Sequence, residues 1–402
     1  MKYKVQGTGG EVGSTRPRYP RGMKSSRRGE VSPFYVMEVM KAAERRQRTT
    51  GDVLHLEVGQ PSTAAPEHVR GAARSAIDSN RLGYTDAAGI PELRRRISLH
   101  YRDAYGVTIP TERITITVGA SGGFVLTTLA SFDAGARVAI TQPGYAAYRN
   151  ILTALDVTVV PIPVGPDTRF NPTPRLLDAA GPLDGLVVAS PANPTGTILR
   201  RDEMAALTDY STAHGLRMIS DEIYHGITYG LVATTAAAYS DSAVVVQSFS
   251  KYYSMTGWRL GWLVLPEDLI GPVERLAQNL FISPPTLSQI AAVSAFGCAD
   301  ELDANVARYS TNRDLLMSAL VRAGIDRLAP AEGAFYVYAD VSHLTDDSQE
   351  LCRIWLDTLG IAATPGIDFD PVDGHRYVRF SYAESTRDIA EAASRLVSWA
   401  AG

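Results

Sequence analysis

Residues 248–261 read SFSKYYSMTGWRLG and continue the short apolar run 244–248, VVVQS. Lys251 lies between two serines, Ser248 and Ser250, and an arginine, Arg259. Hydroxyls and a guanidinium are strong donors to an anion such as a phosphate, and nearby positive charge makes a lysine a better nucleophile by lowering its pKa. A lysine after a strand is usually only a surface residue. Here the serines and the Gly-Trp-Arg triplet favour a reactive amine beside an anion site.

Short runs rich in Val and Ile recur before this segment and alternate with helical patterns. This alternation is typical of a parallel sheet with helices on both faces. We therefore expect an α/β fold of three layers with a mainly parallel sheet. The expected strands are 114–118, 137–141, 157–162, 186–189, 216–220 and 244–248, and the expected helices include 121–130, 145–155 and 203–214.

The pattern changes after about residue 300, where strands 335–341 and 377–382 are grouped with helices 303–323 and 349–359. Such grouping predicts a smaller α+β domain. A helix near the N-terminus, 36–46, is expected to pack against it. We therefore predict a large domain over 62–300, a small domain made of 31–61 and 301–402, and a disordered basic arm over 1–30.

Charge and cysteine content narrow the possible functions. Residues 1–28 carry eight Lys or Arg and one Glu, while the whole chain has a net charge of −4. The body of the protein is therefore acidic, which disfavours nucleic acid as its partner. Cys298 and Cys352 lie far apart and form no CxxC pair, so we predict neither a disulfide framework nor a metal site, and a cytoplasmic location. No apolar stretch is long enough for a membrane span.

Several expected strands end in polar or glycine-bearing loops, which is where open α/β sheets bind ligands. Asp221 directly follows strand 216–220, Asn193 lies after strand 186–189, and Tyr145 follows strand 137–141. The loop GASGG (119–123) opens a helix, so its backbone N–H groups can face an anion. Each feature alone is a common turn, cap or core residue, but together they predict one site.

These motifs make the sequence resemble, from about residue 32 onward, the fold-type I aminotransferases of class I/II, the aspartate-aminotransferase-like enzymes that use pyridoxal 5'-phosphate (PLP). The resemblance implies three catalytic residues, Lys251, Asp221 and Tyr224. Lys251 would bind the PLP aldehyde covalently and later move a proton, and Asp221 would keep the ring nitrogen protonated. Asn193 and Tyr224 would bond to the phenolic oxygen, and Tyr145 would stack on the ring. The remaining implied cofactor ligands are Ala120, Ser121, Gly122, Ser248, Ser250 and Arg259.

The same resemblance implies the substrate ligands. Arg379, in YVRFS (377–381), would bind the α-carboxylate, for which a planar guanidinium is suited. Gly59 and Asn193 would assist it. Phe34 stands where many relatives carry a serine, and no residue is recognisable as an arginine for a second carboxylate, which favours a substrate with a non-acidic side chain.

Tyr84 precedes the segment AGIPELR (88–94), which resembles the part of the family that reaches the phosphate of a neighbouring subunit. We therefore predict a homodimer in which Tyr84 acts in the partner's site. A tyrosine in a loop before a proline-started helix is the plainer interpretation.

We predict a reversible ping-pong transfer of an amino group between an L-amino acid and a 2-oxo acid. One alternative keeps PLP and changes the outcome to elimination, cyclisation or decarboxylation. Another uses the Gly-x-Ser-x-Gly pattern of residues 119–123, in which Ser121 would be the nucleophile of an α/β-hydrolase with His343 or His375. That alternative leaves the other motifs unexplained. The sequence does not identify the amino donor or acceptor.

Overall fold

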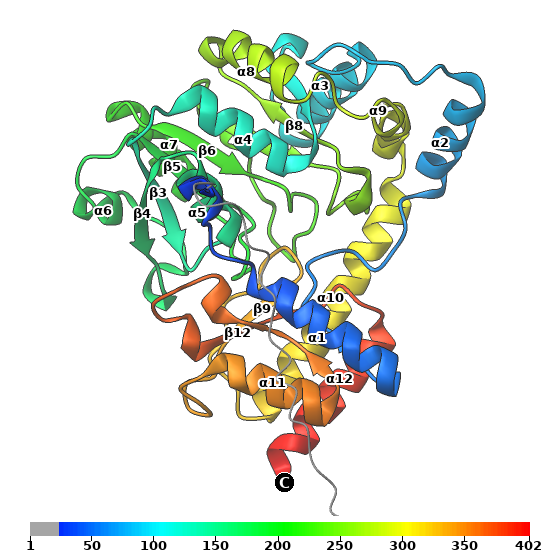
Figure 1. Ribbon diagram of the computed structural model, residues 1–402, viewed down its shortest axis with the longest axis vertical. Coiled ribbons are helices and arrows are strands. Elements are labelled where there is room, and N and C mark those ends of the chain that lie inside the picture. Colours follow the sequence, from blue (N-terminus) through cyan, green and yellow to red (C-terminus); the bar gives the residue numbers. More distant parts are fainter. Residues whose placement is uncertain (1–23) are drawn as a thin grey trace, which may run out of the picture.

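A seven-stranded sheet forms the centre of the larger part of the molecule, in the order β2-β8-β7-β6-β5-β3-β4 (Figure 1). The structure is a computed structural model that describes residues 24–402. The predicted alternation of strands and helices is confirmed. The strands are β2 (Ile114–Thr117), β3 (Arg137–Gln142), β4 (Thr158–Pro163), β5 (Gly185–Ala189), β6 (Arg217–Asp221), β7 (Val244–Ser248) and β8 (Gly261–Val264).

Strand β8 is the one element of this sheet that the sequence did not predict. It runs antiparallel to both of its neighbours, β2 and β7, whereas the other strand pairs are parallel. Because β7 and β8 are adjacent and antiparallel, the segment between them returns at the carboxyl end of β7. This return segment carries Lys251.

Helices cover both faces of the sheet because the buried strands are apolar on both sides. In β7, Val244 and Val246 pack into one hydrophobic cluster and Val245 into another, as the alternation of side chains along a strand requires. One face is covered by α4 (Gly119–Ser131), α5 (Ala146–Ala154) and α8 (Glu267–Leu280). The other is covered by α2 (Glu67–Ser79), α3 (Pro91–Tyr105), α6 (Pro174–Ala179), α7 (Arg201–Ala213) and α9 (Thr286–Val293).

Two smaller sheets form the lower part of the molecule in Figure 1. Strands β11 (Thr364–Pro365), β12 (Tyr377–Ser381) and β9 (Tyr336–Asp340) form an antiparallel sheet, and β1 (Leu54–His55) pairs with β10 (Ile361–Ala362). Their core includes Phe335, Trp355 and Phe380. The surrounding helices are α1 (Tyr35–Thr50), α10 (Ala299–Arg322), α11 (Ser348–Leu359) and α12 (Thr386–Ala401). The predicted fold class, a three-layer α/β part with a smaller α+β part, is therefore confirmed.

The N-terminal region is described only in part. The predicted basic arm lies outside the described residues up to residue 23, and Arg27–Gly29 forms a short 3₁₀ helix. Helix α1 packs through Ala43 against Leu356 and Ala362, close to the other end of the chain. Within residues 24–402, no helix is long and apolar enough to cross a membrane.

Candidate active site

A cavity of about 300 Å³ lies where the carboxyl ends of the parallel strands face the smaller sheets. Residues that follow five different strands, β2, β3, β5, β6 and β7, reach it, because parallel strands end at the same edge of a sheet. The fold thus brings together these predicted site residues: Gly59, Ala120, Ser121, Tyr145, Asn193, Asp221, Tyr224, Ser248, Ser250, Lys251, Arg259 and Arg379. Gly122 lies beside them in the first turn of α4.

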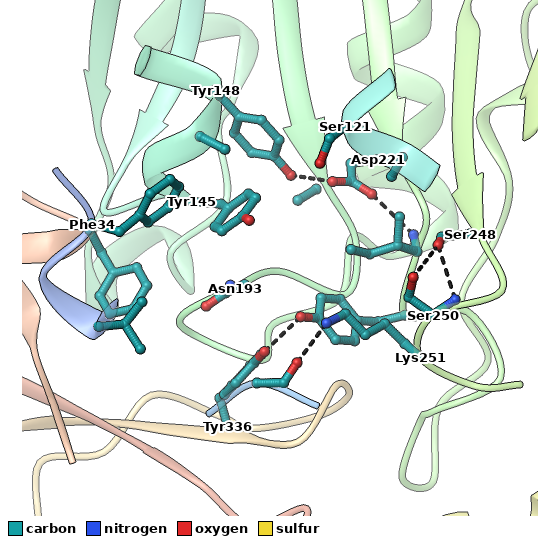
Figure 2. A pocket seen from close by; sticks show the side chains of 18 of the residues that line it. Phe34, Ser121, Tyr145, Tyr148, Asn193, Asp221, Ser248, Ser250, Lys251 and Tyr336 are labelled. Carbon is teal, nitrogen blue, oxygen red and sulfur yellow. Dashed lines mark hydrogen bonds between the residues drawn. The ribbon is translucent and has the colours of Figure 1, made fainter. Parts of the chain in front are cut away.

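The Lys251 amine projects into this cavity from the segment after β7 (Figure 2). Its Nζ donates a hydrogen bond of 2.6 Å to the carbonyl oxygen of Gly59. Burial lowers the pKa of Lys251 to about 8, and the positive charges of Arg379 and Arg259 act in the same direction, while Asp221 opposes them. The neutral, nucleophilic form of this amine is therefore far more populated near neutral pH than that of an ordinary lysine.

One end of the cavity is lined by groups that can donate hydrogen bonds to an anion. The Ser248 hydroxyl lies 2.9 Å from that of Ser250, and both are buried. The first turn of α4 presents its backbone N–H groups nearby, at the positive end of the helix. A Cβ atom at Gly119 would lie 2.6 Å from Nη2 of Arg259, so only glycine lets the guanidinium approach this turn. Hydroxyls, helix N–H groups and a guanidinium are the donor set that a phosphate requires.

Asp221 ends β6 and is only 2% exposed. Tyr148 donates a hydrogen bond to its Oδ2, and the backbone N–H of Ile223 donates to its Oδ1 at 3.1 Å (Figure 2). Burial raises the pKa of Asp221 to about 6, against the effects of Tyr148, Ile223 and Lys251. A carboxylate placed here is suited to hold a protonated ring nitrogen.

Arg379 lies at the opposite side of the cavity, in β12, and is 4% exposed. Its Nη1 donates to Asn193 Oδ1 at 3.0 Å, and its Nη2 donates to the Glu57 carbonyl oxygen at 2.6 Å and to Thr364 Oγ1 at 3.2 Å. No carboxylate pairs with it within residues 24–402, and its buried Nε has no partner. A buried cation without a counter-ion is costly, so this guanidinium is suited to bind an anionic ligand.

The two tyrosines predicted to contact the cofactor also lie in the cavity. Tyr145 precedes α5, and its ring lies edge-on to Tyr148, with centroids 5.4 Å apart. The Tyr224 hydroxyl is 2.7 Å from that of Tyr336. The apolar part of the cavity wall is formed by Phe34, Val36, Met37, Met40, Val58, Phe124, Ile151, Ile223 and Phe369.

Tyr84 and the histidines of the hydrolase alternative do not line this cavity. Tyr84 is 83% exposed and does not line the cavity of its own chain. No histidine of the described residues lines the cavity, so Ser121 has neither His343 nor His375 beside it. The geometry therefore does not assemble the triad of the hydrolase alternative.

Sequence reasoning missed several residues of the site, among them Tyr148, Tyr336 and Asp368. Tyr148 lies three residues after Tyr145 at the start of the same helix, so helical spacing could have indicated that both face one side. Tyr336 and Asp368 come from the C-terminal part of the chain and carried no signal of their own.

A model of the family described as Aminotransferase class I and II matches residues 51–396. The chain belongs to this family. It is 54% identical over 377 residues to a valine–pyruvate aminotransferase of Mycobacterium tuberculosis, covering 92% of this chain and 97% of that protein. It is 31% identical to a (5-formylfuran-3-yl)methyl phosphate transaminase of Methanocaldococcus jannaschii, with coverage of 93% and 98%.

Solved structures agree with this assignment. The crystal structure of an aminotransferase from Mycobacterium tuberculosis superposes with a TM-score of 0.92 at 53% identity, covering 94% of this chain and 99% of that one. The aspartate aminotransferase from Thermus thermophilus with maleate gives a TM-score of 0.88 at 29% identity, with the same coverage. The predicted family, the aminotransferase activity and the use of PLP are therefore confirmed.

Proposed function

We propose that this aminotransferase exchanges an amino group between an L-amino acid with an uncharged side chain and a small 2-oxo acid, with PLP bound through Lys251. The observation that carries this proposal is that the Lys251 amine, the Asp221 carboxylate and the Arg379 guanidinium line one cavity and interact electrostatically there. The three groups match the three demands of the reaction, which are a reactive amine, a partner for the ring nitrogen and a receptor for the α-carboxylate.

The residues that would hold PLP follow from the chemistry of the cavity. Asp221 would bind the ring nitrogen, Asn193 and Tyr224 the phenolic oxygen, and Tyr145 would stack on the ring. When bound, PLP supplies an electron sink for the bonds of the amino carbon. The phosphate would be bound by Ala120, Ser121, Gly122, Ser248, Ser250 and Arg259.

Lys251 has a second task once its amine is free. An amine with a pKa of about 8 can take up and return a proton near neutral pH, which is what a general acid–base catalyst requires. Tyr224, on the same side of the cavity, would keep the phenolic oxygen hydrogen-bonded while this proton moves. Asp221, by staying ionised, would keep the ring nitrogen protonated.

The substrate side chain would meet the apolar wall of the cavity. Arg379 would bind the α-carboxylate, with help from Asn193 and the backbone of Gly59. Among the described residues, the only basic side chains that line the cavity are Lys251, Arg259 and Arg379, and all three have other tasks in this proposal. This leaves none for a second carboxylate. The relative named valine–pyruvate aminotransferase supports valine and pyruvate as the first substrates to test.

We further propose a cytoplasmic homodimer whose Tyr84 acts in the partner's site. Tyr84 is exposed and lines a surface hollow together with Ser283 and Pro284, next in sequence to the exposed Ile282, and exposed apolar side chains gathered in one place are typical of an interface. Cys298 and Cys352 are both buried free thiols, which suits a reducing compartment. Two hydrophobic cores, one formed mostly by residues 62–300 and the other mostly by residues 31–61 and 301–402, support a large domain over 62–300 and a small domain formed by 31–61 and 301–402.

The test is chemical trapping of the cofactor followed by product analysis. Borohydride treatment should remove the visible absorbance of the purified protein, and peptide mapping should find the reduced adduct on Lys251. Mixing with valine and pyruvate should then yield alanine and the 2-oxo acid of valine. An adduct on another lysine would contradict the site. Release of ammonia, carbon dioxide or a cyclic product would instead favour another PLP reaction, and labelling of Ser121 by a serine-directed phosphonate would favour the hydrolase.

A further inference from the structure

Tyr336 occupies a central position in the site that neither the sequence motifs nor the proposed mechanism assigned. It begins β9, is 1% exposed and lines the cavity. Its strand pairs with β12, so that Tyr336 lies opposite Ser381 and Tyr338 lies opposite Arg379. Alternate residues of a strand share a face, and Tyr336, Tyr338 and Arg379 therefore project from the same side of this small sheet.

The Tyr336 hydroxyl contacts two parts of the site at once. It lies 2.7 Å from the Tyr224 hydroxyl (Figure 2). A Cβ atom at Gly59 would lie only 2.0 Å from the same hydroxyl oxygen. Glycine at position 59 therefore leaves the space that the Tyr336 hydroxyl fills, and the Gly59 carbonyl oxygen is the acceptor of the Lys251 amine.

The ring of Tyr336 packs against the guanidinium of Arg379, which the proposed function assigns to the substrate carboxylate. The Cζ atom of Arg379 is 4.4 Å from the centroid of the Tyr336 ring, which is within the range of a cation–π contact. A guanidinium is a permanent cation, and a cation at this distance favours the ionised form of the phenol. Burial raises the pKa of both phenols, more strongly that of Tyr224, and Arg379 lowers the pKa of each. Tyr336 is therefore the more acidic hydroxyl of the pair and the better donor.

The direction of this hydrogen bond decides what Tyr224 can do. Each phenol has one proton, and a contact between two hydroxyls uses one of the two. Within residues 24–402, neither hydroxyl has another hydrogen-bond partner. If Tyr224 donated to Tyr336, it would have no proton left for a ligand in the cavity. If Tyr224 accepts, its own proton is free to point into the cavity.

We propose that Tyr336 is a positioning residue that donates to Tyr224 and so directs the Tyr224 proton toward the phenolic oxygen of the cofactor. This inference rests on the proposed function, because it presupposes a phenolic oxygen beside Tyr224. A hydroxyl that accepts a hydrogen bond becomes a stronger donor itself. Tyr336 therefore stabilises the ionised form of the cofactor's phenolic oxygen through Tyr224. Its ring also stabilises the Arg379 guanidinium through the cation–π contact.

The test is a pH titration of the visible absorbance of the bound cofactor, without substrate. Tyr336→Phe keeps the ring and removes the hydroxyl that donates to Tyr224. The apparent pKa of the bound cofactor should therefore rise by about 0.5 unit, as expected from one neutral hydrogen bond that acts through a second one. Tyr338→Phe is the matched control. Tyr338 is equally buried on the same strand and face, its hydroxyl has no hydrogen-bond partner among residues 24–402, and it does not line the cavity. Its substitution should leave the titration unchanged.

A double-mutant cycle shows whether Tyr336 acts through Tyr224. In a Tyr224→Phe background, Tyr336→Phe should cause no further shift. Tyr336→Leu, which also removes the ring, should raise the KM for the amino acid about 3- to 10-fold, as loss of a buried cation–π contact implies, whereas Tyr336→Phe should change it less than about 2-fold.

The outcomes separate this inference from the proposed function. A wild-type protein with no titratable visible band would overturn both. A normal wild-type titration with no shift in Tyr336→Phe would overturn only the role of Tyr336. A downward shift would show that Tyr224 donates to Tyr336, and a shift that persists in the Tyr224→Phe background would show that Tyr336 acts by another route, so either result refutes the inference.

Discussion

The first turn of α1 is held by a carboxylate from the far end of the chain. The backbone N–H groups of Tyr35 and Val36 donate to Asp368 at 3.1 and 3.4 Å. Phe34, the residue before the helix, provides no side-chain cap of its own. Its ring reaches the cavity, with its centroid 5.9 Å from that of Tyr145. We predict that Asp368→Asn loosens this first turn and selectively weakens the use of amino acids with larger apolar side chains.

The magnitude follows from the contact that is lost. The substitution keeps an acceptor at the helix N-terminus and removes its charge, which is worth about 0.3–2 kcal/mol in partly buried geometries. This corresponds to a decrease of about 2- to 30-fold in kcat/KM for valine. Alanine has no side-chain carbons beyond Cβ to contact Phe34, so we expect the kcat/KM for alanine to change less. Asp368 also interacts electrostatically with Arg379, which lowers the pKa of Asp368 against the effect of burial, and the ratio of kcat/KM for valine to that for alanine removes any effect that both substrates share.

The assay is the single-turnover change in cofactor absorbance after mixing with valine or alanine, which requires no second substrate. Phe34→Ala should lower the valine-to-alanine ratio in the same direction as Asp368→Asn. Asp370→Asn is the control, because Asp370 is also buried but accepts hydrogen bonds from the backbone of Val372 and Asp373 rather than from the first turn of α1. Equal losses for valine and alanine in Asp368→Asn, or an unchanged ratio in Phe34→Ala, would refute the reasoning.

Three further predictions concern other parts of the site. Asp221→Ala should still bind PLP but slow the half-reaction by about 100-fold or more, because the ring nitrogen loses its charged partner; similar rates in rapid-mixing experiments would contradict this role. Burial raises the pKa of Glu222 to about 8, so the folded protein keeps a proton that the unfolded chain loses, and the cofactor-free protein should become less stable as the pH rises from about 5 to about 8. Urea unfolding should show that Glu222→Gln removes roughly 3–5 kcal/mol of this dependence, and an unchanged slope would show that Glu222 titrates normally. Mixing Lys251→Ala with Tyr84→Phe protomers should restore activity beyond either parent through subunit exchange, whereas no recovery with an impaired Tyr84→Phe parent would place Tyr84 in the site of its own subunit.

The strands and the residues that follow them could be predicted because each of them is indicated by a short, continuous stretch of sequence. Asp221 and Lys251 directly follow short apolar runs, and the carboxyl ends of parallel strands meet at one edge. Once the alternation of strands and helices was recognised, the proximity of these residues followed without further information. The three-layer arrangement followed for the same reason, since β7 is apolar at successive positions and must be covered on both faces.

Strand β8 and the residues Tyr336 and Asp368 could not be predicted in this way. Strand β8 has four residues, and its pairing with β2 joins segments about 150 positions apart. Tyr336 reaches Tyr224 only because β9 pairs with β12 and the small sheet faces the large one. Asp368 reaches α1 across more than 330 residues. Such contacts depend on tertiary packing, which the periodicity of one segment does not encode.

The electrostatics of the cavity link these distant parts in the proposed reaction. Burial lowers the pKa of Lys251, and Arg379 is the strongest of the charges that lower it further. When a substrate carboxylate binds Arg379, its negative charge offsets that effect, and the pKa of the free Lys251 amine must rise. The amine therefore becomes a stronger base when a substrate is present to be deprotonated. Because Arg379 is fixed by Asn193, Thr364 and the carbonyl oxygen of Glu57, this coupling requires the small sheet to be docked on the large one. A free carboxylate that saturates Arg379 should accordingly shift the pH dependence of the half-reaction of a small amine toward higher pH.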